Sequence, residues 1–144
     1  MKSVWLFRIS AAVLFLFGAL HTFGFLTFRP KEAAGLAVWN AMNEVHFHEG
    51  NGIFSYGAFY RGFGLFVTMA FFFCALVGLH LANTVKKNPV AVGWLGWALF
   101  ALQAANLVLA WRYFGAPQIA FSLLAAACTG LAAATVPGAA KLHG

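Results

Sequence analysis

The sequence predicts an all-α protein, a four-transmembrane-helix bundle with a short amphipathic helix in its long first loop. Only 8% of the 144 residues are charged and 62% are hydrophobic, with a mean hydropathy of +0.82. A soluble domain carries about 25% charged residues, so this composition excludes that class. Four stretches without Asp, Glu or Lys are each close to the roughly 20 residues that cross a bilayer as a helix; they cover residues 9–28, 62–84, 90–111 and 117–137. We therefore expect one integral membrane domain over residues 1–144.

The first stretch is expected to be a membrane helix. Its apolar run of some 20 residues exceeds the roughly 7–15 residues of the apolar region of a signal peptide, and no small-residue cleavage site follows it. The loop after it, residues 29–61, holds all three carboxylates of the chain. Within this loop Val38 and Met42 fall on one helical face, with Trp39 beside them as an interfacial anchor. The pattern predicts a short amphipathic helix that the sequence GNG at residues 50–52 ends.

The remaining stretches follow at short intervals. Asn88 and Pro89 make the turn into the third span, and the fourth span is rich in Ala and Gly, which allow close helix packing in lipid. A β-barrel is excluded because runs such as residues 70–77 are apolar on every face.

The net charge of +6 does not indicate a nucleic-acid partner. The basic residues stand singly at span ends instead of forming a patch. Their distribution favours both termini on the cytoplasmic side: with the amino terminus inside, the Lys86–Lys87 turn, Lys2, Arg8 and Lys141 all fall on the inner side. Membrane lipids are then the expected surroundings of the chain.

In this topology several polar residues lie at a similar depth in the outer half of the membrane. His21 lies roughly 10 Å from the outer end of the first span, and Gln103 and Asn106 lie at a similar depth of the third. Tyr60 and Arg61 precede the second span on the same side. We expect these five residues to form an outward-facing ligand-binding pocket, since ionisable groups in a membrane are functional candidates. The alternatives are an interhelical hydrogen bond for His21, helix–helix bonds for the two amides and a lipid contact for Arg61.

The sequence EVHFHE at residues 44–49 is the most metal-like feature. In an extended strand Glu44, His46 and His48 would share one face and provide three ligands, although the spacing matches no standard zinc or calcium pattern. A polar surface loop is the alternative.

Glu44 or Glu49, with His21 orienting the substrate, would be the candidates for acid–base catalysis. No cofactor is identified by the sequence.

Two further pairs of residues, one of histidines and one of cysteines, are not expected to form a functional site. His21 and His80 should lie too far apart in depth to share a haem iron. Cys74 and Cys128 lie mid-span with no Cys-x-x-Cys pair, so we expect them to be buried apolar residues.

The chain resembles the DoxX-like group of small bacterial four-helix membrane proteins. The resemblance lies in Arg8 at the start of the first span, in FGALH at residues 17–21 and in SYGAFYRGFGL at residues 55–65. It implies a four-helix bundle in the bacterial inner membrane, in a group linked to quinone or thiosulfate oxidation complexes, often as companion subunits. No family catalytic residue transfers to this chain.

We interpret the chain as an accessory subunit of a membrane complex or as a lipophile-binding bundle, since no complete catalytic set is present. Its expected protein partner is a larger membrane complex or a second copy of the chain in a homo-oligomer. The alternatives are a membrane-embedded enzyme acting on a lipophilic substrate through Glu44, Glu49 and His21, and a metal- or quinone-linked redox protein using His21, His46 and His48. A small transporter is less favoured because no inverted repeat is visible.

Overall fold

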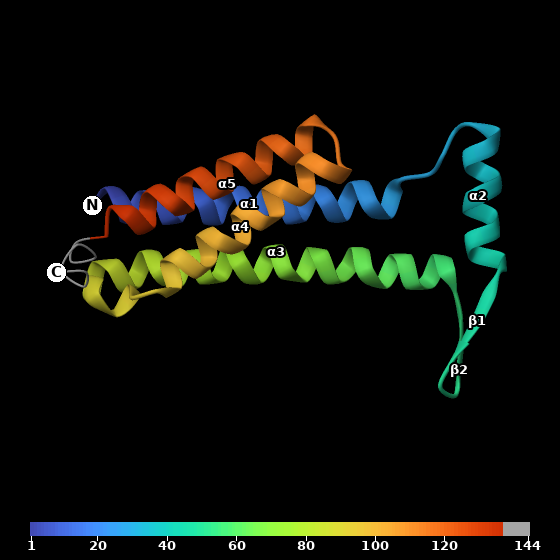
Figure 1. Ribbon diagram of the computed structural model, residues 1–144, viewed down its shortest axis with the longest axis horizontal. Helices are drawn as coiled ribbons and strands as arrows, with labels where there is room; N and C mark the ends of the chain where they lie inside the picture. The colour runs from blue at the N-terminus through green and yellow to red at the C-terminus, as the bar shows by residue number, and fades with distance from the viewer. Residues whose placement is uncertain (137–144) are drawn as a thin grey trace. The chain divides into compact units, whose positions relative to one another are not determined.

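The computed structural model describes residues 1–136 and is predominantly helical (Figure 1). In chain order its elements are α1 (Lys2–Thr27), α2 (Ala33–Glu44), β1 (His46–Glu49), β2 (Gly52–Ser55), α3 (Tyr56–Lys87), the 3₁₀ turn η1 (Pro89–Val92), α4 (Leu95–Tyr113) and α5 (Ala116–Ala134). Residue 137 of the predicted fourth span and Lys141 lie outside the described residues.

Three of the described helices, α1, α3 and α5, are long and apolar enough to cross a membrane. The prediction of a helical protein with several transmembrane segments is confirmed to that extent. Helix α4 covers most of the predicted third span, although it begins at Leu95 instead of residue 90, and it is not among the three. It carries Gln103, Asn106 and Arg112 within 19 residues. The four-span bundle therefore stays a prediction.

Two helices begin earlier than the sequence predicts. Helix α1 begins at Lys2 instead of residue 9, and α3 begins at Tyr56 instead of residue 62. The start of α3 has a local cause: the Ser55 hydroxyl accepts a hydrogen bond from the Ala58 N–H at 3.1 Å. This contact caps the first turn, so the aromatic segment before the predicted span becomes helical.

The chain divides into two compact units whose boundaries fall inside α1 and α3. The first unit comprises residues 1–17 and 71–144, and the second comprises residues 18–70.

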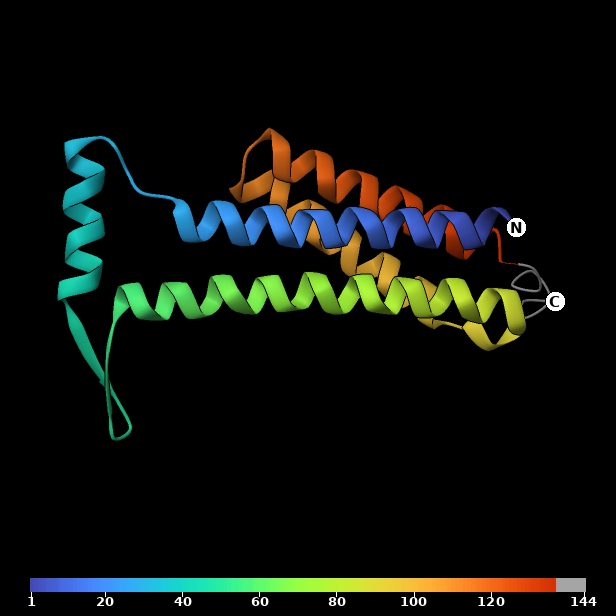
Figure 2. The ribbon, with the colours of Figure 1, turned by 180° about the vertical axis from the view of Figure 1, so that it is seen from behind.

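In the first unit α5 runs along the N-terminal part of α1 and packs against α4 (Figure 2). Its buried face consists of small residues, as the Ala- and Gly-rich sequence predicts; they are Ser122, Ala125, Ala126, Cys128, Thr129, Ala132 and Ala133. Phe7 and Leu14 of α1 are fully buried in the same core. The ring of Phe17 stacks on that of Phe121, with centroids 5.0 Å apart, and contacts the ring of Phe71, with centroids 4.4 Å apart. The α1 and α3 segments of this unit run antiparallel (Figure 2). They approach closely, since a Cβ on Gly78 would lie 3.2 Å from that of Ala11.

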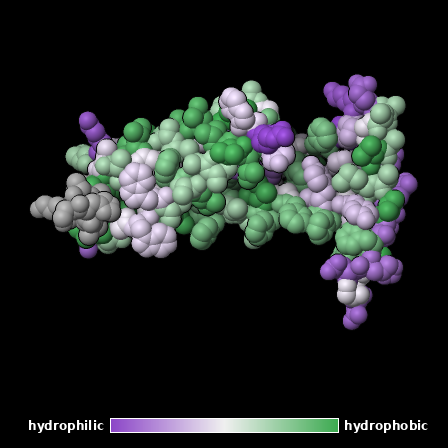
Figure 3. All heavy atoms as spheres, viewed as in Figure 1, coloured by the Kyte–Doolittle hydropathy of each residue, from purple (hydrophilic) through white to green (hydrophobic). Residues whose placement is uncertain are grey.

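The second unit contains the end of α1, α2, a β-hairpin and the start of α3. Helix α2 confirms the short helix expected in the first loop, but it ends at Glu44, before the sequence GNG at residues 50–52. Strands β1 and β2 pair antiparallel, with His46 opposite Ser55 and Glu49 opposite Gly52. Gly50, in the two-residue turn between them, has φ +55°, a conformation that favours glycine. Hydrophilic residues concentrate on α2 and the hairpin in Figure 3, where the charged residues of the first loop lie.

Candidate functional site

The polar contacts of the second unit centre on the main-chain carbonyl of Gly64 in α3. His21 Nε2 lies 3.2 Å from this oxygen, and the Thr68 hydroxyl donates to it at 3.3 Å. A carbonyl only accepts, so Nε2 of His21 carries the hydrogen in this contact. Thr22 donates to the Gly18 carbonyl at 2.7 Å and lies 2.9 Å from the Thr68 hydroxyl. The two hydroxyls therefore bond each other, and each also donates to a main-chain carbonyl of its own helix.

Aromatic rings cover this polar cluster. The His21 ring stacks on Phe25, with centroids 5.6 Å apart and an interplanar angle of 13°, and Phe25 meets Tyr60 at 5.2 Å. The Phe25 ring lies directly over Gly64: a Cβ built there would be 2.6 Å from Phe25 Cε2 and closer still to Cζ and Cε1. Only a residue without a side chain lets the ring lie this close to the helix backbone.

The residues of the predicted polar pocket are divided between the two units. His21, Tyr60 and Arg61 belong to the second unit, where Phe25 joins the first two and Arg61 is exposed. Gln103 and Asn106 belong to the first unit. A common pocket of all five residues stays a prediction.

The two amides are held inside the first unit. Asn106 Nδ2 donates to the Ser122 hydroxyl at 3.1 Å, which joins α4 to α5. Gln103 is only 2% exposed. The Asn106 bond is the helix–helix contact that the sequence offered as its alternative role.

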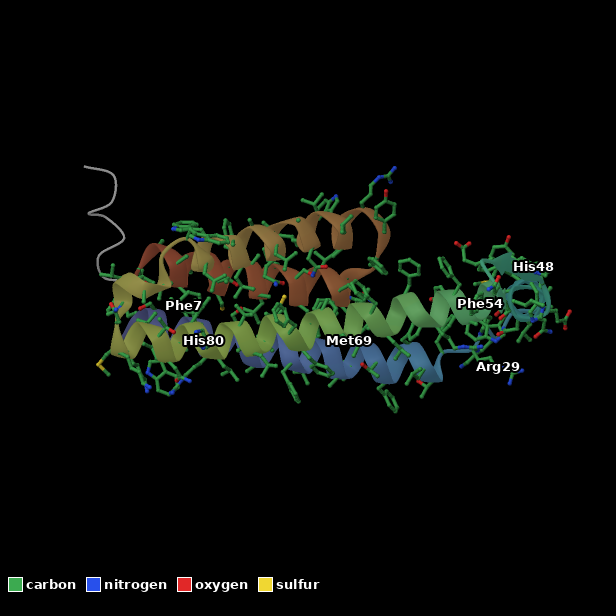
Figure 4. All side chains as sticks on the ribbon, turned by 90° about the horizontal axis from the view of Figure 1, so that it is seen from below. Phe7, Arg29, His48, Phe54, Met69 and His80 are labelled. Carbon is green, nitrogen blue, oxygen red and sulfur yellow. The ribbon has the colours of Figure 1, made fainter. Side chains whose placement is uncertain are left out.

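The predicted strand with three metal ligands does not form. Glu44 is the last residue of α2, where the Val45 N–H still bonds the Ala41 carbonyl, so only His46 and His48 lie on β1. His46 Nδ1 lies 2.7 Å from the main-chain carbonyl of Glu44 and donates to it. His48 and Phe54 lie in the hairpin (Figure 4), and the two histidines, Glu44 and Glu49 are all exposed. Within residues 1–136 no group of three His, Cys, Asp or Glu side chains is placed to hold a metal ion.

Hydroxyl groups that were not among the predicted site residues join α1 to α5. Ser10 lies 3.1 Å from the Thr129 hydroxyl and donates to the Ala125 carbonyl at 3.5 Å; Thr129 also donates to that carbonyl. Ser10 and Thr129 are fully buried. Short hydroxyl residues on otherwise apolar helices were the available signal. Cys74 and Cys128 are buried and free, as expected.

A groove between α1 and α3 in the first unit is the main feature that the sequence did not reveal. It has a volume of about 520 Å³ and apolar walls apart from one basic residue; its lining is Arg8, Ala11, Ala12, Phe15, Phe72, Ala75, Leu76 and Leu79. We call it the α1–α3 groove. The Phe15 and Phe72 rings are in contact, with centroids 5.2 Å apart. Small alanines on both helices create the hollow between larger side chains.

A second hollow shares Arg8 with this groove. It has a volume of about 380 Å³ and is lined by Met1, Val4, Trp5, Arg8, Val85 and Lys86. We call it the basic mouth. The Arg8 guanidinium lies 5.5 Å above the Trp5 ring, a cation–π contact that orients it.

Comparison with known proteins gives no family to which the chain can be assigned. No protein-family model matches the sequence, and neither a curated protein nor a solved structure shows significant similarity to it. The DoxX-like resemblance stays a prediction.

Proposed function

We propose that this chain is a multi-pass membrane protein that binds a lipophilic molecule, with the α1–α3 groove as its binding place. The groove is the observation that carries this proposal. Its volume of about 520 Å³ falls in the range of small-molecule sites, roughly 300–1,000 Å³. Seven of its eight lining residues are apolar, which suits a hydrocarbon chain.

The surroundings support a ligand from the membrane. Phe15 is 60% exposed and Leu76 65% exposed at the groove, so large apolar side chains border it. Exposure on this scale is unfavourable in water and normal in lipid. A membrane lipophile can therefore enter from the side of the helices.

The polar contacts within each unit hold its helices together. The contacts of His21, Thr22 and Thr68 run between α1 and α3, and those of Ser10 and Thr129 between α1 and α5. Such bonds hold helices together in lipid. Glu44 and Glu49, the acid–base candidates, lie in α2 and β1.

We further propose that α4 is a fourth span and that the protein lies in a bacterial inner membrane with its termini cytoplasmic. The DoxX-like motifs and the Lys86–Lys87 pair at the end of α3 support this placement. A companion role in a larger membrane complex is consistent with a bound lipophile.

The test is retention of a lipophile by the purified full chain. Ala12 lines the groove and is exposed, so Ala12→Phe should fill the hollow without disturbing the core. Ala101 on α4 is also exposed and lies outside the groove lining, which makes Ala101→Phe the matched control. After prolonged detergent washing, lipid extraction and mass spectrometry should find a stoichiometric lipophile on wild type and Ala101→Phe and little on Ala12→Phe. Equal retention by the two variants would contradict the proposal.

A further inference from the structure

We propose that the ligand of the α1–α3 groove is an anionic glycerophospholipid, with its phosphate held by Arg8 and Lys86 in the basic mouth. This inference rests on the proposed lipophile-binding function and adds the headgroup chemistry to it.

The two hollows share one lining residue. Arg8 lines both the apolar groove and the basic mouth, so a chain-binding surface and a cationic surface meet at one side chain. Along α1 the groove runs from Arg8 to Phe15, a rise of about 10 Å. One leaflet of hydrocarbon is about 15 Å deep, so the groove covers a large part of one acyl chain. A phospholipid has this same order of parts, with a phosphate at one end and a chain beneath it.

The charge of the first unit also favours an anionic ligand. Residues 1–17 and 71–144 contain no Asp or Glu, since all three carboxylates of the chain lie between residues 32 and 49. The first unit therefore supplies no acidic side chain to neutralise Arg8 and Lys86. A cation without a counter-charge beside hydrocarbon is costly, and a phosphate drawn from the membrane would remove that cost.

The geometry of Arg8 suits a phosphate. Its side chain is only partly exposed, and its guanidinium is held over the Trp5 ring. A planar guanidinium donates two parallel hydrogen bonds to phosphate oxygens, and a pre-ordered one loses less freedom on binding. Lys86, in the last turn of α3, adds a second cation to the mouth.

The same charges select among phospholipids. A choline or ethanolamine headgroup would place another cation beside Arg8 and Lys86. An uncharged glycerol headgroup leaves the phosphate charge uncompensated, and basic pockets between membrane helices favour such anionic lipids. We therefore infer phosphatidylglycerol chemistry in preference to phosphatidylcholine.

The experiment uses the full chain in detergent with two probes of identical acyl chains, phosphatidylglycerol and phosphatidylcholine, and reads bound lipid by native mass spectrometry. Wild type should prefer phosphatidylglycerol. Arg8→Gln and Lys86→Gln should each weaken its binding about five-fold, the effect of roughly one basic residue near an anionic lipid. Lys87→Gln removes the same charge from a neighbouring position outside the mouth and should leave the preference intact. Free glycerol phosphate should not compete, because it has no chain for the groove.

The outcomes separate the two proposals. Suppose that Ala12→Phe abolishes lipid binding. If the wild type then binds both probes with equal affinity, or if Arg8→Gln and Lys87→Gln lose equal affinity, the headgroup inference alone is overturned. Lipid binding that Ala12→Phe leaves unchanged overturns the groove itself. If Arg8→Gln loses its helical circular dichroism, Lys86→Gln decides the test, and its failure to weaken phosphatidylglycerol binding refutes the inference.

Discussion

Replacing Gly64 by alanine should destabilise the contact between α1 and α3 in the second unit. The added Cβ would lie 2.6 Å from Cε2 of Phe25 and closer still to Cζ and Cε1, so the ring must move. Moving it disturbs its stacking with His21 and its contact with Tyr60. Overpacking of this kind costs about 1–3 kcal/mol, whereas alanine gains about 1 kcal/mol over glycine inside a helix. The net loss should be between about 0 and 2 kcal/mol.

The matched control is Gly62→Ala on the same helix. A Cβ at Gly62 meets nothing within 4 Å, so this variant should show only the helix-propensity gain. Unfolding free energies from SDS titration, followed by circular dichroism, should differ between the variants by about 1–3 kcal/mol. In a Phe25→Ala background the Gly64→Ala penalty should disappear, because the clash has no partner. Equal stability of Gly64→Ala and Gly62→Ala would refute the close approach of Phe25.

The other predictions use the polar contacts and the span count. Thr68→Val should cost about 0.6–1.7 kcal/mol in the same titration, since it removes the hydroxyl that bonds Thr22 and the Gly64 carbonyl, and no loss would show that these contacts are not maintained. Ser10→Ala should cost a similar amount, and a double-mutant cycle with Thr129→Ala should show coupling; strict additivity would contradict the bond between them. For α4, single cysteines at Lys87 and Gly115, in a background with both native cysteines replaced by alanine, should react with an impermeant maleimide from opposite sides of the membrane. Labelling from the same side would exclude α4 as a span.

The sequence predicts the apolar helices well because a segment inside the hydrocarbon of a membrane must be both apolar and helical. It also predicts α2, where the residues Val38, Trp39 and Met42 mark one face. The early start of α3 depends on the Ser55 cap, a single polar contact that hydropathy does not record. The sequence did not predict the hairpin because its strands have only four residues each, too short for a periodic pattern.

The candidate site was less predictable. The depth of His21 along its span predicted it as a site residue. Its contact in the structure is with the main-chain carbonyl of Gly64. Every residue has such a carbonyl, so the sequence could not predict this partner. The α1–α3 groove depends on Ala12 and Ala75, which line it from two different helices. Alanines are common in this chain, so only tertiary packing shows which of them leave a hollow. Arg8, which marked the family resemblance, proved to be the residue shared by both hollows.

The lipid-binding claim is tested most directly by an experimental density map of the full chain in phosphatidylglycerol-containing nanodiscs. We predict acyl-chain density in the α1–α3 groove between Phe15 and Leu76, with a phosphate within roughly 4 Å of the Arg8 guanidinium, the distance of an ion pair. A groove closed by its own side chains, or covered by a second copy of the chain, would contradict the claim.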